Sequence, residues 1–464
     1  DFKIKLSTMN THQFLLDNGY SAEDPDFSRI ARKAHNLINN EGMAPEKALA
    51  QLREEDGMPE KKLSFTDRPQ PIRVYGKIGT DIDQQAYDQL EKACRLPVAL
   101  AGALLPDAHL GYALPVGGVV ALKNAVSPAF VGFDIACRMK MSILDISVDA
   151  FEKRREQLAA NLDDVTQFGL GANFGFNRRS HPVQDDPRWT EIKPAKKLRE
   201  KADRQLGSSG SGNHFADLMV GTVVQNRAWL PLDKGDQFVA LVTHSGSRGT
   251  GYKLATHYKN LAEEHTQRIS KGISKSYAWL SLDSAAGQEY WQAMQLIGKY
   301  ASANHELMHE HFGKESGIGI VDTYENHHNF AWEREVDGQK WIIHRKGATP
   351  AAPGVVGIIP GSMGTPSFLV EGKAGRESLW SSAHGAGRIS SRTQAKKDHD
   401  AEAYKKFLKE KDILTIRVAK DETYQSYKDI NRVMELQKDL VDVIARMEPR
   451  VVVMGGGRRS DDGD

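Results

Sequence analysis

The sequence lacks several features that would assign a protein to a familiar class. Its 464 residues hold only two cysteines, Cys94 and Cys137, too few for a disulfide framework. We find no signal peptide and no apolar run near the roughly 18 residues of a membrane span. Lysine and arginine number 62 against 61 acidic residues, so an anionic partner would need a local basic patch. We therefore expect a globular cytoplasmic protein with no membrane association.

The common nucleotide-binding signatures are also missing. Each Gly-Lys pair is followed by Ile, Tyr, Glu or Ala and never by Ser or Thr, which excludes a P-loop. No Lys-x-Asp-Gly segment occurs, so a ligase that forms a lysine adenylate is unsupported. Covalent activation of a nucleotide would have to use another nucleophile.

Two kinds of pattern divide the chain. Residues 1–62 are polar, with Ile30, Ala34 and Leu37 about one turn apart, which predicts a helical N-terminal extension. Residues 63–454 alternate helical patterns, such as the segment 285–312, with short apolar runs that end in glycine, such as "AFVGFDIACRMKMSIL". Such runs predict buried strands. The fold class is α+β (mixed α and β), with one large domain over 63–454 and a disordered tail over 455–464.

Potential metal ligands stand at the ends of the predicted strands. They are a carboxylate, a thiol and several imidazoles: Asp134, Cys137, His214, His244 and His328. Mn, Fe, Co and Zn accept these donors. Each one alone is more often a buried structural residue, but their recurrence beside glycine loops favours a shared site. A thiolate that bridges two metal ions would suit phosphoryl or nucleotidyl transfer.

Glycine-rich turns supply exposed N–H groups that bind phosphate. The segments "GSSGSGN", "HSGSRGTG", "PGSMG" and "HGAGR" are of this kind. A tight turn is the commoner explanation of any one of them, but several adjoin histidine or arginine, which a plain turn does not require. In "HGAGR", His384 precedes a basic series: Arg388, Arg392, Lys396 and Lys397.

The segment from His305 to His309 matches the His-Glu-x-x-His motif of zinc hydrolases, with Glu306 as the candidate base. Phe312 stands where the longer metzincin pattern requires Gly. The surrounding helix is amphipathic, and we expect both histidines on its solvated face.

Short motifs follow one another from about Val74 to Met454. In order they are "PDAHLGYALPVGGV", "VGFDIAC", "GSSGSGNHF", "HSGSRGTG", "HHN", "HRKGAT", "IIPGSMGTPSF", "HGAGR" and "YKDI". This ordered set resembles the RtcB family of RNA-splicing ligases. The resemblance implies one catalytic domain with β-sheets packed as a sandwich, surrounded by helices, and an active-site cleft at strand ends and glycine loops.

The resemblance also implies an activity. It is that of a GTP- and manganese-dependent ligase, which joins an RNA 3′-phosphate or 2′,3′-cyclic phosphate end to a 5′-hydroxyl end in RNA splicing or repair. His384 would be guanylylated and would pass GMP to the RNA, giving an RNA-3′-pp-G intermediate. GTP, two Mn ions, RNA and an activating protein are the implied cofactors and partners.

Residue roles follow from the resemblance position by position. Asp134, Cys137, His214, His244 and His328 would bind metal, with the Cys137 thiolate as a bridge. The nucleotide site would comprise Asn213, Asp217, His328, Asn329, Pro360, Gly361, Ser362, Met363, Ser367, His384, Gly385, Ala386, Gly387 and Tyr427. Tyr427 would pack on the guanine. Arg248 and Arg388 would contact phosphate or RNA, as forked donors do.

Three positions depart from the family pattern. Asp217 replaces the usual Glu, Arg138 replaces the Gly after the cysteine, and Met454 replaces a Lys near the end of the chain. We expect weaker GTP binding as a result. The alternatives are a dinuclear metallophosphatase or cyclic phosphodiesterase, an enzyme that caps nucleic-acid 3′-phosphate ends, and a non-catalytic RNA-end sensor. His384 separates the ligase from the hydrolases, because a hydrolase does not need this nucleophile.

Overall fold

The computed structural model describes residues 10–18, 20, 27–56, 63–169, 171–175, 179–270, 272–417 and 420–455. The chain forms two compact units. One comprises Asp1–Phe65 and Glu264–Lys275, and the other comprises Thr66–Glu263 and Ser276–Asp464. Of the predicted tail, residues 456–464 lie outside the described residues. No helix in the described ranges is long and apolar enough to cross a membrane.

The first unit contains several short helices before residue 57. They are α1 (Thr11–Asp17), α2 (Phe27–His35), the π-helical turn Asn36–Asn40 and α3 (Pro45–Asp56). Ile30, Ala34 and Leu37 are buried in a small apolar core. The one-turn spacing of these residues gives α2 its buried stripe.

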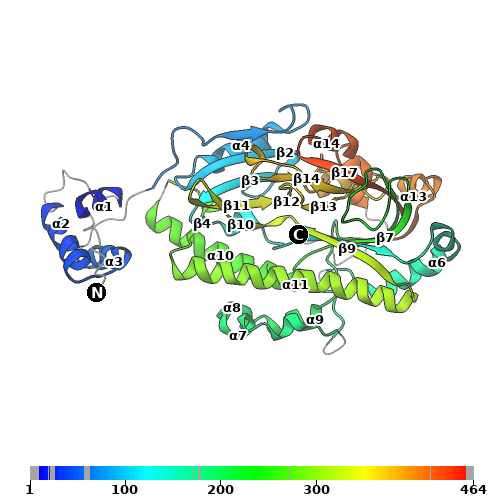
Figure 1. Ribbon diagram of the computed structural model, residues 1–464, viewed down its shortest axis with the longest axis horizontal. Coiled ribbons are helices and arrows are strands. Elements are labelled where there is room, and N and C mark those ends of the chain that lie inside the picture. The colour runs from blue at the N-terminus through cyan, green and yellow to red at the C-terminus, as the bar shows by residue number, and fades with distance from the viewer. Residues whose placement is uncertain are drawn as a thin grey trace. The chain divides into compact units, whose positions relative to one another are not determined.

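Two large sheets form the second unit (Figure 1). The order in the first is β1 (Ile72–Val74), β2 (Ala99–His109), β3 (Val116–Lys123), β11 (Gln339–Lys346) and β10 (Asn329–Val336). The order in the second is β13 (Val356–Ile359), β14 (Ser367–Gly372), β17 (Val441–Met454), β6 (Phe215–Val223), β7 (Gln237–Ser245), β5 (Arg138–Leu144) and β9 (Ile320–His327), and β16 (Leu414–Arg417) pairs with β17. The short pairs are β12 (Ala348–Pro350) with β15 (Ser381–Ala383), and β4 (Ala125–Val126) with β8 (Leu280–Ser281).

An apolar cluster joins the two large sheets. It combines Val119 and Ile343 of the first sheet with Phe368 and Val441 of the second. Burial of apolar side chains from both sheets in one cluster is the packing of a β-sandwich. The mixed α and β class and the sandwich expected from the sequence are therefore confirmed.

Helices complete the second unit. They are α4 (Gln84–Cys94), α5 (Pro128–Val131), α6 (Val148–Val165), α7 (Arg188–Glu191), α8 (Lys193–Lys196), α9 (Arg199–Gln205), α10 (Arg248–Ile269, whose last turns belong to the first unit), α11 (Ala285–Ser316), α12 (Arg392–Asp398), α13 (Ala401–Glu410) and α14 (Ile430–Leu436). The helix predicted from residue 285 onward is α11, which begins at the cap Ser284 and ends at Gly317. The run "AFV" is helix α5 and not a strand, because Pro128 occupies a first-turn position that favours a helix start.

Candidate active site

The predicted metal ligands come from neighbouring strands of the second sheet. Cys137 directly precedes β5, His214 directly precedes β6, His244 lies near the end of β7 and His328 directly follows β9. These strands are antiparallel, and Arg138 pairs in register with both Ser245 and His327. One sheet edge therefore gathers side chains that are far apart in the sequence.

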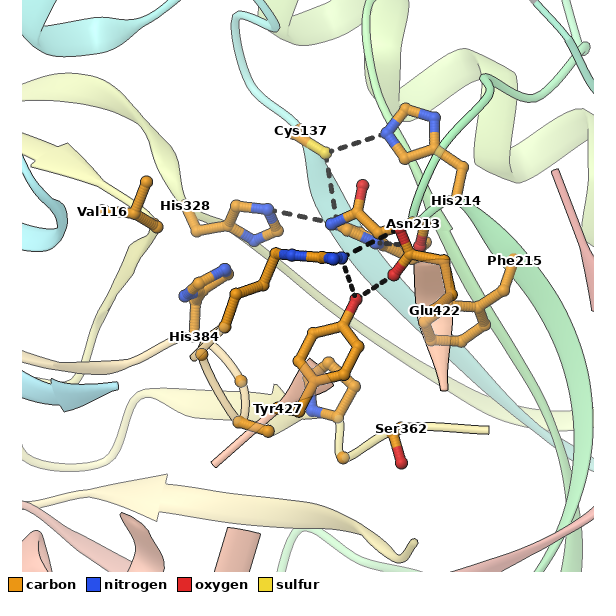
Figure 2. Close-up of a pocket in the computed structure, with 18 of the residues that line it drawn as sticks. Val116, Cys137, Asn213, His214, Phe215, His328, Ser362, His384, Glu422 and Tyr427 are labelled. Atoms are coloured by element: carbon orange, nitrogen blue, oxygen red, sulfur yellow. Dashed lines mark hydrogen bonds and ion pairs between the residues drawn. The ribbon is translucent and has the colours of Figure 1, made fainter. Parts of the chain in front are cut away.

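The resulting donor cluster consists of Asp134, Cys137, His214, His244 and His328. Figure 2 labels three of its members, Cys137, His214 and His328. Cys137 Sγ lies 3.4 Å from His214 Nε2 and 3.2 Å from His244 Nε2. His244 Nε2 lies 3.2 Å from His328 Nε2, and His214 Nε2 lies 3.2 Å from Asp134 Oδ2. Ligand atoms of Cys137, His214 and His244 lie close enough together to share one ion.

The hydrogen bonds and pKa values of the cluster suit a cation. His244 Nδ1 lies 3.1 Å from the carbonyl of Asn213, so the proton sits on that nitrogen and Nε2 presents a lone pair. His214 Nδ1 and His328 Nδ1 are buried and have no hydrogen-bond partner in the described parts of the chain. Burial lowers the pKa of His244 to about 3. Neutral imidazoles around a cysteine form a donor set that fits Mn or Zn.

The pKa values of the two other donors, Cys137 and Asp134, are shifted in opposite directions. Burial, together with the neighbouring charge of Asp134, raises the pKa of Cys137 well above its usual value. Burial alone would raise the pKa of Asp134, but the hydrogen bond and charge of His214 outweigh it and lower that pKa. A divalent ion would take the place of the thiol proton. Gly246 makes room for this carboxylate, because a Cβ there would lie 2.1 Å from Asp134 Oδ1.

His384 stands beside the donor cluster, with its ring centroid 4.7 Å from that of His328. Its Nδ1 lies 2.6 Å from Asp107 Oδ2, and its backbone N–H donates to the same oxygen at 3.1 Å. Asp107 is fully buried. A carboxylate at Nδ1 holds the proton on that nitrogen and leaves a lone pair on Nε2. Gly387, at φ +74°, permits this contact, because a Cβ there would lie 2.1 Å from the carbonyl oxygen of Asp107.

A cavity of about 350 Å³ opens beside these groups, a size that suits a small-molecule ligand. Of the residues expected at the site, it is lined by Asp134, Cys137, Asn213, His214, Asp217, His244, His328, Asn329, Pro360, Gly361, Ser362, Met363, Ser367, His384, Gly385, Ala386, Gly387, Arg388 and Tyr427. Arg248 is not on the cavity wall. It is buried and donates to Ser208 and to the carbonyl of Gly169.

Two of the positions that depart from the family pattern lie on the cavity wall. Asp217 and Met454 both line it, and each is nearly fully buried. Asp217 Oδ1 has no hydrogen-bond partner in the described ranges. Burial raises the pKa of this carboxyl well above its usual value. A buried acceptor with no partner costs free energy unless a ligand supplies a donor.

An ion-pair network forms another part of the wall. Arg388 Nη1 lies 3.1 Å from Glu422 Oε1 and 3.3 Å from the Tyr427 hydroxyl. The Tyr427 hydroxyl also donates to Glu422. Burial raises the pKa of Glu422. Arg388 therefore already has a partner, and its contact with phosphate stays a prediction.

The histidines of the His-Glu-x-x-His motif lie elsewhere than expected. His305 and His309 are buried, at 0% and 1% exposure. Thr243 Oγ1 lies 2.6 Å from His305 Nδ1 and 2.8 Å from His309 Nε2, and Ser142 Oγ lies 2.7 Å from His309 Nδ1. The expectation of a solvated face is wrong, because α11 turns this face toward β5 and β7. We call His305 and His309 the hydroxyl-bonded pair.

Comparison with known proteins assigns the family. Residues 89–455 match the family described as tRNA-splicing ligase RtcB. The chain belongs to the RtcB family. RNA-splicing ligase RtcB of Escherichia coli K12 is 30% identical over 425 residues, covering 84% of this chain and 99% of that protein. RNA-splicing ligase RtcB of Mycobacterium tuberculosis H37Rv is 30% identical over 432 residues, covering 79% and 100%.

A more distant relative extends the comparison. tRNA-splicing ligase RtcB of Thermococcus kodakarensis is 28% identical over 465 residues, covering 83% of this chain and 95% of that protein. These relatives are named as ligases, and this RtcB-family chain is accordingly an enzyme of the ligase class.

Three side chains at the RtcB-family site were not predicted from the sequence. Asp107 and Lys346 lie within quoted motifs, "PDAHLG" and "HRKGAT", which could have drawn attention to them. Lys346 lines the cavity, and burial lowers its pKa to about 8. No sequence motif indicated Glu422, because an acidic residue five positions before Tyr427 forms no recognisable pattern. Arg138 points away from the cavity and pairs with Glu325 at 2.9 Å.

Proposed function

We propose that this protein is a GTP- and Mn-dependent RNA ligase that joins 3′-phosphate or 2′,3′-cyclic phosphate ends to 5′-hydroxyl ends. The single observation that carries the proposal is the contact between His384 and Asp107, at 2.6 Å. A phosphatase or cyclic phosphodiesterase has no need of an oriented imidazole nucleophile beside its metal ligands. The names of the family relatives, RNA-splicing and tRNA-splicing ligases, supply the substrate class.

The proposed reaction has three steps. His384 Nε2 attacks the α-phosphorus of GTP, forming a P–N bond as pyrophosphate leaves. The RNA 3′-phosphate then attacks the same phosphorus, so that the P–N bond breaks and an RNA-3′-pp-G anhydride forms. The RNA 5′-hydroxyl finally attacks the 3′-phosphorus, which seals the strand and releases GMP. A cyclic phosphate end is first hydrolysed to the 3′-phosphate.

The surrounding residues have distinct roles in this proposal. Asp107 orients the His384 ring and keeps a proton on Nδ1, so that Nε2 is ready to attack. The donor cluster would hold the Mn ions, which offset charge on reacting phosphates when bound. Lys346 adds a half-buried cation on the same wall. Asp217 and Tyr427 would contact the guanine, and the glycine-rich segments that contain Ser362 and Gly385 line the same cavity.

The test is incubation with α-labelled GTP and Mn²⁺, followed by isolation of an acid-labile protein adduct. The parent should form the adduct, whereas His384→Ala should not. His384→Ala should still seal an RNA supplied with a 3′-pp-G end, because only the earlier steps pass through the imidazole. Asp107→Asn is the matched control for orientation, and it should slow adduct formation without removing bound Mn. Adduct formation by His384→Ala would refute the assignment.

A further inference from the structure

Three aromatic rings form a continuous surface next to the donor cluster. Phe133 lies between Tyr112 and Tyr252, with ring centroid distances of 5.7 Å and 5.3 Å. Tyr112 and Tyr252 are 53% and 52% exposed. We call these three residues the aromatic platform. Phe133 also packs against the hydrophobic core, but interior packing does not account for Tyr112 and Tyr252, because buried tyrosines of this chain such as Tyr258 and Tyr290 are nearly inaccessible. Large exposed aromatic side chains mark binding surfaces.

The backbone ties the platform to the candidate active site. Phe133 directly precedes Asp134, a member of the donor cluster. Tyr252 lies in the first turns of α10, and the N–H of Ser247 just before that helix donates to Asp134 at 3.0 Å. Tyr112 follows three residues after His109, which lines the cavity. A bound polymer that lies on the aromatic platform would therefore lead directly to the candidate active site.

Three lysines lie beside the platform. The ammonium group of Lys259 lies 5.9 Å from the Tyr112 ring centroid and pairs with Glu263 at 2.6 Å. Lys253 adjoins Tyr252 and is exposed, and Lys201 Nζ lies against Gly249 in the first turn of α10. No ion pair joins Lys201 or Lys253 to an acidic group in the parts of the chain that the structure describes. Burial and the charges of Lys253 and Arg248 lower the pKa of Lys201. Uncompensated cations next to flat apolar rings suit a polyanion that carries bases.

We propose that the aromatic platform binds single-stranded RNA next to the ends that are joined, with bases stacked on Tyr112 and Tyr252 and backbone phosphates held by Lys201 and Lys253. This inference rests on the proposed RNA ligation. It assigns the RNA strand a surface outside the nucleotide cavity. The platform is sequence-tolerant, because every base has a face that can stack.

Stacking is tested with a pair of matched double variants. Tyr112→Leu with Tyr252→Leu keeps apolar volume but removes the flat rings, whereas Tyr112→Phe with Tyr252→Phe keeps them. The probe is a fluorescent single-stranded dodecaribonucleotide with a 5′-hydroxyl, titrated without GTP so that no covalent step occurs. The Leu pair should bind it about ten-fold to a hundred-fold more weakly, and the Phe pair should bind like the parent.

Other outcomes of this experiment would overturn either the inference or the proposed function on which it rests. Equal binding by the parent and the Leu pair would show that RNA does not use these rings, and equal losses in the Leu and Phe pairs would exclude stacking. Loss of guanylylation by the Leu pair in the absence of RNA would show damage to the site itself. A parent that binds the RNA but forms no guanylate adduct would refute the proposed function and not the platform.

The phosphate contacts are tested through salt dependence. Lys253→Gln should reduce the slope of log Kd against log salt concentration by about 0.7, the value for one contact with a single strand. Lys123→Gln is the matched control, because Lys123 is exposed at the opposite end of β3 from Val116, which lines the cavity. It should leave the slope unchanged. Equal slopes for Lys253→Gln and the parent would contradict the proposed contact.

Discussion

Two groups of buried histidines involve successive residues of strand β7, His244 and Thr243, and differ in their partners. The donor cluster meets β7 at His244, where nitrogens and sulfur face one another across 3.2–3.4 Å. The hydroxyl-bonded pair meets it at Thr243, where the imidazole nitrogens are matched with hydroxyl groups. Adjacent residues of a strand point to opposite faces, so β7 separates the two groups.

Burial does not distinguish these groups. Burial lowers the pKa values of His244, His305 and His309 alike. The difference lies in what the imidazole nitrogens face. The Nε2 atoms of His214, His244 and His328 face a thiol and one another, which is a set of lone pairs that a cation can join, whereas the nitrogens of the hydroxyl-bonded pair that meet hydroxyl groups are already satisfied. The comparison teaches that the partner of a buried histidine, and not its depth, indicates whether it binds metal.

The largest expected effect comes from the donor cluster. His244→Gln keeps the approximate volume but removes the imidazole nitrogen that faces Cys137. We expect loss of bound Mn, measured by elemental analysis, and a loss of RNA sealing on the order of a thousand-fold or more. Retention of both the full metal content and the sealing rate would show that the cluster is not the metal site.

Removal of the hydroxyl-bonded pair should instead affect stability. His305→Ala with His309→Ala leaves cavities and unpaired hydroxyls, so the free energy of unfolding should fall by about 2–5 kcal/mol. Urea titration measures this change. Bound Mn and the sealing rate per folded molecule should stay close to those of the parent. Loss of metal together with an unchanged unfolding midpoint would revive the zinc-hydrolase interpretation of this motif.

Acid should destabilise the protein through both groups. A buried neutral histidine has a folded pKa below its unfolded value near 6.5, so the unfolded chain takes up protons first as the pH falls. The free energy of unfolding is then fully present above about pH 6.5 and decreases below it, by up to about 1.4 kcal/mol per pH unit for each such histidine. Urea titrations between about pH 7.5 and pH 5 should show a shallower dependence for the double alanine variant. Parallel curves for the variant and the parent would contradict this account.

The smallest effect concerns Asp217, a buried acceptor without a partner. If its carboxylate binds guanine, Asp217→Asn should raise the GTP concentration for half-maximal guanylylation about ten-fold and leave Mn binding intact. Since burial raises the pKa of Asp217 and donors on the base favour the ionised form, GTP should bind more tightly as the pH rises. Met454→Lys should tighten GTP binding relative to the parent, because lysine supplies a hydrogen-bond donor and a positive charge that methionine lacks. Unchanged GTP dependence, with ATP still rejected, would show that other groups recognise the base.

Part of this structure could be predicted from the sequence. The donor types recur at strand ends, and the apolar spacing in α11 predicted a long helix. The partner of His384 could not be predicted from spacing, because Asp107 lies 277 positions earlier. Helical periodicity also did not predict the burial of His305 and His309. It identifies an apolar stripe but cannot show that a second, polar stripe faces hydroxyl groups on a sheet.

The place of β17 has a consequence for protein synthesis. This strand, Val441–Met454, is the last among the described residues, yet it lies between β14 and β6 in the interior of the second sheet. Beyond it, the N–H of Gly455 donates to the carbonyl of His214 at 2.8 Å. A ribosome that has translated everything up to β16 has therefore made every proposed metal ligand and the nucleophile, but not the strand that unites the sheet. Prematurely terminated polypeptides would carry two unpaired strand edges, which favour aggregation and degradation, so the cell would accumulate few partly active fragments.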